Sequence, residues 1–180
     1  MLFVNSSIIF HIVPILGSKG ESSEVAATLL SLQIFLSVPI VLFCAWAADR
    51  IGGTKVMVAM MLLTLAGVVA LLHAQSLWGY VFASSLLAFG GSNWAILWAV
   101  LGRMYGRRHY NSIRMSIYSI LIGGMATAPL LAGLSFDATQ SYTTWLQLLI
   151  VVAAVGVAFF VATVKAERGW MVSLEPGKAA

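Results

Sequence analysis

Polar side chains inside long apolar runs are the residues of this sequence whose types could do chemistry. Amides and hydroxyls can hydrogen-bond a solute, and an imidazole can take up a proton near neutral pH. Gln33 and Ser37 are four residues apart, so in a helix they share one face. We predict a polar substrate cavity lined by side chains of this kind, namely His11, Gln33, Ser37, Asn93, Ser116 and Ser119.

The same side chains have a simpler interpretation. Ser116 and Ser119, with Gly123, form a stripe of small residues that would let two helices pack closely. A single histidine inside an apolar segment can also be neutral and satisfied by hydrogen bonds. Packing is favoured for the serines, whereas the larger polar groups of Asn93, Gln33 and His11 fit a cavity better.

The elements that must position these residues are membrane helices. The chain has 180 residues, of which 61% are hydrophobic and 9% charged. Soluble domains carry about 25% charged residues, so this composition excludes an ordinary soluble enzyme, a disordered chain and a nucleic-acid-binding protein. One cysteine, Cys44, excludes an internal disulfide. The apolar runs lack the period-2 alternation of a membrane barrel.

The expected fold is therefore all-α and integral to the membrane, with six transmembrane helices. A spanning helix needs about 20 apolar residues, and the charged residues fall between segments of about this length. The segments form a bundle over 1–165, followed by a polar tail over 166–180. The predicted spans are about 1–16, 25–47, 56–72, 78–101, 115–136 and 145–164.

The distribution of basic residues predicts the orientation. Of the ten lysines and arginines, Lys19 alone falls on one side of the predicted membrane. Cytoplasmic loops are enriched in lysine and arginine, so the opposite side, with both termini, is expected to face the cytoplasm from a plasma (inner) membrane. The net charge of +4 is then a topology signal. The lipid bilayer is the predicted partner, and nucleic acid is not.

The third and sixth spans carry few polar side chains, and we expect them at the periphery, facing lipid. The first, second, fourth and fifth would then line the cavity. A peripheral helix in the third position of each triplet suggests two three-helix units, and such units form inverted repeats in many transporters.

The segment from Ala45 to Lys55 is the most specific motif. It resembles the cytoplasmic signature of the major facilitator superfamily, in which a glycine is followed by an aspartate, a basic residue, a second glycine and further basic residues. The matching positions are Asp49, Arg50, Gly52 and Lys55, while Ala45 and Thr54 depart from the pattern. The resemblance implies a cytoplasmic gate in which Asp49 pairs with Arg103. The alternative is a set of basic anchors at the membrane surface.

The degenerate form of this motif resembles the copy between helices eight and nine of that superfamily. It implies the C-terminal half, helices seven to twelve, of a twelve-helix transporter. The first span is short and has no charged residue before it, which favours the later part of a longer transporter. The segment 11–14 and the segment 102–114 are similar to the monocarboxylate and oxalate–formate branches. Those branches imply a small organic solute, with carboxylates as a candidate class and a proton as a candidate coupling ion. Their basic residue within helix eight or eleven has no counterpart in 25–47 or 115–136.

The expected function is secondary active transport by alternating access. The partner would be an N-terminal six-helix half or a second copy of the chain. One alternative is a non-transporting membrane fragment or assembly subunit. A membrane enzyme is disfavoured because the sequence has no H-E-x-x-H, no G-x-S-x-G and no paired intramembrane aspartates. We predict no catalytic residue, no cofactor and no metal site.

Overall fold

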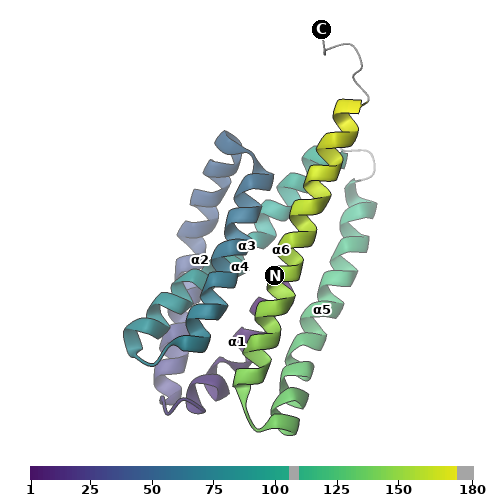
Figure 1. Cartoon of the computed structure of the whole chain (residues 1–180). Helices are drawn as coiled ribbons and strands as arrows, with labels where there is room; N and C mark the ends of the chain where they lie inside the picture. Colours follow the sequence, from purple (N-terminus) through teal and green to yellow (C-terminus); the bar gives the residue numbers. More distant parts are fainter. Residues whose placement is uncertain (106–109, 174–180) are drawn as a thin grey trace.

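The computed structural model describes the backbone of residues 1–105 and 110–173, and side chains within 1–102 and 110–164. The described chain is helical almost throughout, and its six helices run alongside one another in a single bundle (Figure 1). The helices are α1 (Leu2–Gly17), α2 (Ser23–Ile51), α3 (Gly53–His73), α4 (Leu77–Tyr105), α5 (Tyr110–Thr139) and α6 (Tyr142–Ser173).

The helices α2 to α6 each contain a segment that is long and apolar enough to cross a membrane. The helix α1 has 16 residues, which corresponds to about 24 Å and falls short of a hydrocarbon core of about 30 Å. Figure 1 shows that the chain begins part-way along the bundle, whereas α6 extends beyond it at the other end of the chain. The six predicted spans thus correspond to six helices, of which the first is short.

Most helices are longer than the apolar spans predicted for them. Helical hydrogen bonding continues past the last apolar residue, so the ends of the helices carry polar and charged side chains. The helix α5 begins at Tyr110, which places Arg114 within the helix and not in the predicted loop. Similarly, the predicted tail from residue 166 continues as α6 to Ser173.

The position of α3 differs from the expectation for a peripheral helix. It packs on α2, α4 and α6, with its most extensive contact against α4, and buries side chains from Val56 to Leu71. By contrast, α5 buries Ala128 and Ala132 alone. The polar residue in the interior of α3, Thr64, is satisfied within its own helix, because its hydroxyl donates to the Met60 carbonyl at 2.8 Å. The lack of polar side chains in α3 therefore reflects contact with other helices as much as contact with lipid.

Two glycines allow α3 and α4 to approach closely. A Cβ atom on Gly67 of α3 would lie 3.0 Å from the backbone nitrogen of Leu87. A Cβ atom on Gly90 of α4 would lie 2.9 Å from the Cγ2 atom of Thr64. Small residues bring helix backbones together in this way where no hydrophobic effect drives association within lipid.

Lys19 ties the first interhelical connection to the end of α3. Its ammonium group donates to the carbonyls of Leu71, Leu72 and Ala74 at 2.7, 2.9 and 3.0 Å. The last carbonyls of a helix have no partner within the helix, and a positive charge suits the negative end of the helix dipole. Burial lowers the pKa of Lys19 from its ordinary value. The one basic residue on its side of the predicted membrane thus has a structural role.

Replacing Lys19 by methionine is expected to destabilise the bundle, because three carbonyls lose their donor. A hydrogen bond to a charged group contributes about 1.5–3 kcal/mol, and loss of this magnitude should lower the temperature of thermal unfolding measurably. The matched control is Lys55→Met, which removes an exposed lysine from the first turn of α3. Equal unfolding temperatures for the two variants would contradict a capping role for Lys19.

Candidate solute-binding site and gate

Three consecutive polar residues make α1 the centre of the hydrogen-bond network. Asn5 accepts from the Nε2 atom of Gln33 on α2 at 3.1 Å. Ser6 donates to the carbonyl of Met125 on α5 at 2.8 Å, and Ser7 accepts from the indole of Trp145 on α6 at 2.6 Å. Successive residues of a helix point about 100° apart, so three neighbours reach three different helices. All three polar residues are buried.

The hydrogen bond from Ser6 compensates for a proline in α5. Pro129 has no backbone N–H, so the carbonyl of Met125, four residues earlier, has no helical partner at that position. The hydroxyl of Ser6 supplies one. The proline is therefore accommodated by a side chain of a different helix, which sequence analysis missed because Ser6 was not among its candidates.

His11 lies at the junction of α1, α5 and α6. Its Nε2 atom is 3.0 Å from the carbonyl oxygen of Pro129, and its Nδ1 atom is 3.2 Å from the hydroxyl of Tyr142. A carbonyl only accepts, so Nε2 carries the hydrogen, and Nδ1 of a neutral ring accepts from Tyr142. Both ring nitrogens of His11 thus have a hydrogen-bond partner on another helix.

Gln33 and Ser37 lie together, as their spacing predicted. With Asn5 of α1 and Gly91 of α4, they line a pocket of about 90 Å³. The amide of Gln33 is held by Asn5, and the hydroxyl of Ser37 donates to the carbonyl of Ile34 at 2.6 Å. That Gln33 and Ser37 contact a solute in this pocket stays a prediction.

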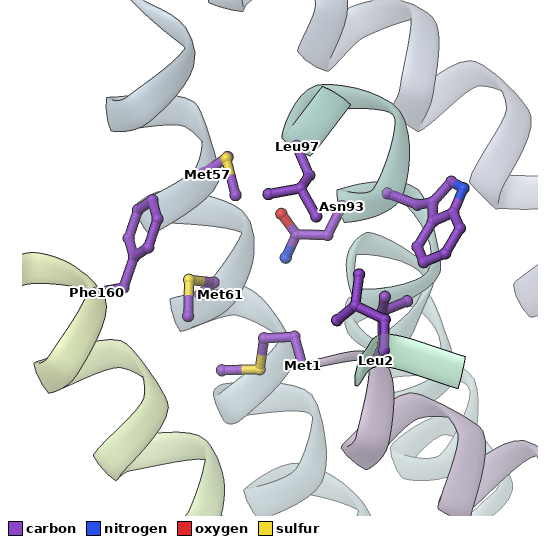
Figure 2. A pocket seen from close by; sticks show the side chains of 9 residues that line it. Met1, Leu2, Met57, Met61, Asn93, Leu97 and Phe160 are labelled. Atoms are coloured by element: carbon purple, nitrogen blue, oxygen red, sulfur yellow. The ribbon is translucent and has the colours of Figure 1, made fainter. Parts of the chain in front are cut away.

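Asn93 lies in a different pocket from Gln33, and residues of α1, α3, α4, α5 and α6 line that pocket. That pocket has a volume of about 150 Å³ and mostly apolar walls. Figure 2 shows the Asn93 amide pointing into the space between Met57, Met61 and Leu97. The predicted cavity residues are therefore distributed over more than one pocket in this half-bundle.

Ser116 and Ser119 are exposed on α5. Their hydroxyls donate to the carbonyls of Ser112 and Met115, each at 3.0 Å. Serines in helices commonly satisfy themselves in this way with the carbonyl four residues earlier. No helix of the described bundle covers these serines, so close packing within it does not explain them, and their role in a cavity stays a prediction.

An aromatic cluster around Arg114 forms a site that sequence analysis did not single out. The ring centroids of Trp94 and Trp98 are 5.3 Å apart, and those of Trp94 and Tyr118 are 5.5 Å apart. The guanidinium carbon of Arg114 lies 5.1 Å from the centroid of Trp98, in a cation–π contact. Together with Asn111, residues of this cluster line a pocket of about 510 Å³ between α4 and α5.

The spacing of these residues in the sequence could have indicated the aromatic cluster. Trp94 and Trp98 are one helical turn apart, as are Arg114 and Tyr118, so each pair shares a face. The error was to place Arg114 in a loop, since the helical register begins at Tyr110. The indole N–H of Trp98 is buried, and no acceptor for it lies within the described part of the chain.

The motif residues surround the turn between α2 and α3. This turn is Gly52 alone, whose φ of +97° favours glycine because it lies where L side chains clash with the backbone. Asp49 lines a pocket of about 210 Å³ with Gly53 and a face of α4 that includes Ile96 and Val100. Asp49, the predicted gate residue, thus lies against α4, the helix that also contains its predicted partner Arg103.

The basic residues of the motif behave differently from one another. The guanidinium of Arg50 lies 4.9 Å from the ring centroid of Trp46, one turn earlier on α2, and Lys55 is exposed. The side chain of Arg103 lies outside the described residues, so its predicted pairing with Asp49 stays a prediction. For Arg50, stacking on a neighbouring tryptophan is the contact observed.

These features define a class of protein. The described chain is an all-helical integral membrane bundle with buried interhelical hydrogen bonds, a one-residue turn at a charged motif and an arginine–aromatic pocket. The sequence profile of the Major Facilitator Superfamily matches residues 1–177, and the chain belongs to this family. The fold is a six-helix half-bundle of the facilitator type. Members of the family are transporters, which supports a non-enzymatic function.

The match identifies the superfamily and does not identify a branch within it. It gives no support to the narrower resemblance to monocarboxylate and oxalate–formate transporters. A comparison with curated proteins finds no match.

Proposed function

We propose that this chain is the C-terminal half of a secondary transporter that moves a small organic carboxylate by alternating access. The observation that carries the substrate class is the arginine in the aromatic pocket between α4 and α5. Arginine binds carboxylates through two parallel N–H groups, and its charge is permanent. The side-chain amide of Asn111, which lines the same pocket, offers a further N–H donor for a carboxylate oxygen.

The pathway requires a second six-helix bundle, either an N-terminal half or a second copy of this chain. The helices α2 and α5 are the surfaces proposed to meet it, because both are long and mostly exposed in this half. The hydroxyls of Ser116 and Ser119 follow the exposed face of α5. Such a polar stripe suits a water-filled pathway better than contact with lipid tails.

The proposed gate is the turn at Gly52. In one conformation Asp49 would pair with Arg103 at the same end of the bundle, and the pair would separate in the other. An ion pair that forms in only one of two conformations stabilises that conformation and so shifts the equilibrium between the two. This end carries most of the basic residues, so we place it, with the C-terminal end of α6, on the cytoplasmic side of the plasma membrane; Met1 lies part-way along the bundle.

The proposal is tested by uptake into proteoliposomes. Light scattering on the purified 19.3 kDa chain first establishes whether it is a dimer. Vesicles containing the chain are then given a panel of labelled small carboxylates and, as neutral comparisons, labelled sugars. Saturable carboxylate uptake above empty vesicles is expected. A stable monomer without uptake would contradict transport by this chain and favour an assembly subunit.

In the same vesicles, Asp49→Asn is expected to reduce the maximal rate of uptake while the amount of inserted protein stays unchanged. The substitution keeps the size of the side chain and removes its charge, so it weakens any ion pair at the gate. The control is Glu24→Gln, which removes an exposed carboxylate from the first turn of α2 at the opposite end of that helix. Equal rates for both variants and the wild type would contradict the gate.

A further inference from the structure

The pocket that contains Arg114 has a polar end and an aromatic end. On α5 its lining follows spacings of three, one and three residues, which is one face of a helix, and consists of Asn111, Arg114, Met115 and Tyr118. The polar pair begins this face, and Tyr118 lies one turn after Arg114, about 6 Å further along the helix axis. Trp94 contributes the wall on α4. A ligand in this pocket therefore meets donors at one end and aromatic rings at the other.

The guanidinium of Arg114 is held in place by its stacking on Trp98. Its central carbon lies 5.1 Å from the Trp98 ring centroid, and the hydroxyl of Tyr110 donates to the Trp98 carbonyl at 3.3 Å, which ties the first turn of α5 to α4. Stacking occupies the flat face of a guanidinium, whereas its N–H groups lie in the plane and stay available to a carboxylate. The positive charge is thus presented at one end of the pocket.

The rings of Trp94 and Tyr118 line the pocket at an angle to one another. Their centroids are 5.5 Å apart and their planes are inclined by 61°, so the pocket offers two differently inclined aromatic surfaces. Aromatic side chains near a membrane surface commonly anchor a helix in the lipid headgroups. These two rings instead contact one another between α4 and α5, where a planar ligand can pack edge-to-face or offset against them.

We propose that this pocket selects single-ring aromatic carboxylates, with the carboxylate on Arg114 and Asn111 and the ring against Trp94 and Tyr118. The inference rests on the carboxylate site of the proposed function and narrows its substrate class. A saturated ring of the same size carries the same charge and more hydrogen atoms but no π-system. Charge and apolar area alone would therefore favour the saturated acid, or neither acid, whereas contact with aromatic rings favours the aromatic one.

The test is a competition between benzoate and cyclohexanecarboxylate. Equilibrium dialysis measures the binding of labelled benzoate to the full purified chain in detergent at neutral pH, with empty micelles as the blank, and each unlabelled acid then competes. Benzoate is expected to bind about fivefold more tightly than cyclohexanecarboxylate, from the usual strength of aromatic pairs. Benzamide, which has the ring without the charge, should compete weakly with labelled benzoate.

Variants assign the preference to the aromatic wall. Tyr118→Leu should reduce the ratio of the two affinities to about twofold, because one of two rings is lost, and Tyr118→Phe should restore it. The matched control is Phe159→Leu, which removes an exposed ring from α6 and should leave the ratio unchanged. Arg114→Gln should weaken the binding of both acids alike.

The outcomes separate this inference from the proposed function. Equal or reversed affinities in the wild type would overturn the aromatic preference, even if Tyr118→Leu fails to fold, and so would a ratio that Tyr118→Leu leaves unchanged. If carboxylates are taken up by the vesicles while the two acids bind equally, transport stands and the preference falls. If benzoate is preferred but no carboxylate is taken up, the binding preference stands and transport by this chain falls.

Discussion

Replacing Gly90 with leucine is expected to separate α4 from α3 and α1 and to destabilise the bundle severely. A Cβ atom at this position would lie 2.9 Å from Thr64 Cγ2, 3.2 Å from Thr64 Oγ1 and 3.4 Å from Asn5 Oδ1. Thr64 is fully buried and β-branched, so it has little freedom to move aside. The remaining atoms of leucine would have to displace the backbone.

Overpacking of this kind lowers the free energy of unfolding by about 1–3 kcal/mol and occasionally by more. The loss should be at the upper end at Gly90, because the helix shift would also disturb the hydrogen bond between Asn5 and Gln33. The measurement is the temperature of unfolding in detergent, with Gly90→Ala as an intermediate case. Gly156→Leu on α6 is the matched control, since no atom lies within 4 Å of a Cβ there. Similar unfolding temperatures for the two leucine variants would show that the α3–α4 contact is not tight.

The second large effect is expected at Arg114. Substitution by glutamine should raise the KM for carboxylate uptake about 10- to 100-fold, since a hydrogen bond to a charged group contributes about 1.5–3 kcal/mol and each 1.4 kcal/mol is tenfold. Arg114→Lys retains the charge but not the planar stacking on Trp98, so its KM should fall between those of the wild type and Arg114→Gln. The helix itself should tolerate these changes because Arg114 is exposed.

The kinetic pattern distinguishes this site from the gate. Loss of a binding group should raise KM, whereas Asp49→Asn should lower the maximal rate, because it changes the conformational step. A neutral solute carried by the same protein should be insensitive to Arg114. An unchanged KM in Arg114→Gln, or equal losses for neutral and anionic solutes, would exclude Arg114 from carboxylate recognition.

Much of the fold could be predicted from the sequence because its signals are local to each helix. The excess of apolar residues requires helices with their hydrogen bonds satisfied internally, and charged residues mark where those helices leave the lipid. The motif from Ala45 to Lys55 indicated the superfamily, which the sequence profile supports. The structure confirms the six helices, and it shows that Gly52 is the entire turn between α2 and α3, where the predicted connection was longer.

The candidate site depended on contacts between helices, and only part of it could be predicted. Spacing within one helix correctly grouped Gln33 with Ser37, but it could not show that Asn93 lies in a different pocket. Nor could it show that Ser6 satisfies a carbonyl that Pro129 leaves without a partner on another helix. Arg114 was misplaced because a charge before an apolar run marks the edge of the lipid, whereas the helix continues beyond that edge.

The sequence by itself determined that this protein is a bundle of membrane helices and which residues lie at the ends of each. Those properties follow from transfer of single side chains between water and lipid, which depends on residue type alone. The tertiary structure decided that α1 is the centre of the polar network, that α3 is enclosed and that Arg114 lies among aromatic rings. Such properties depend on which helix faces are in contact, and within lipid this choice is made by close packing and hydrogen bonds between residues distant in the chain.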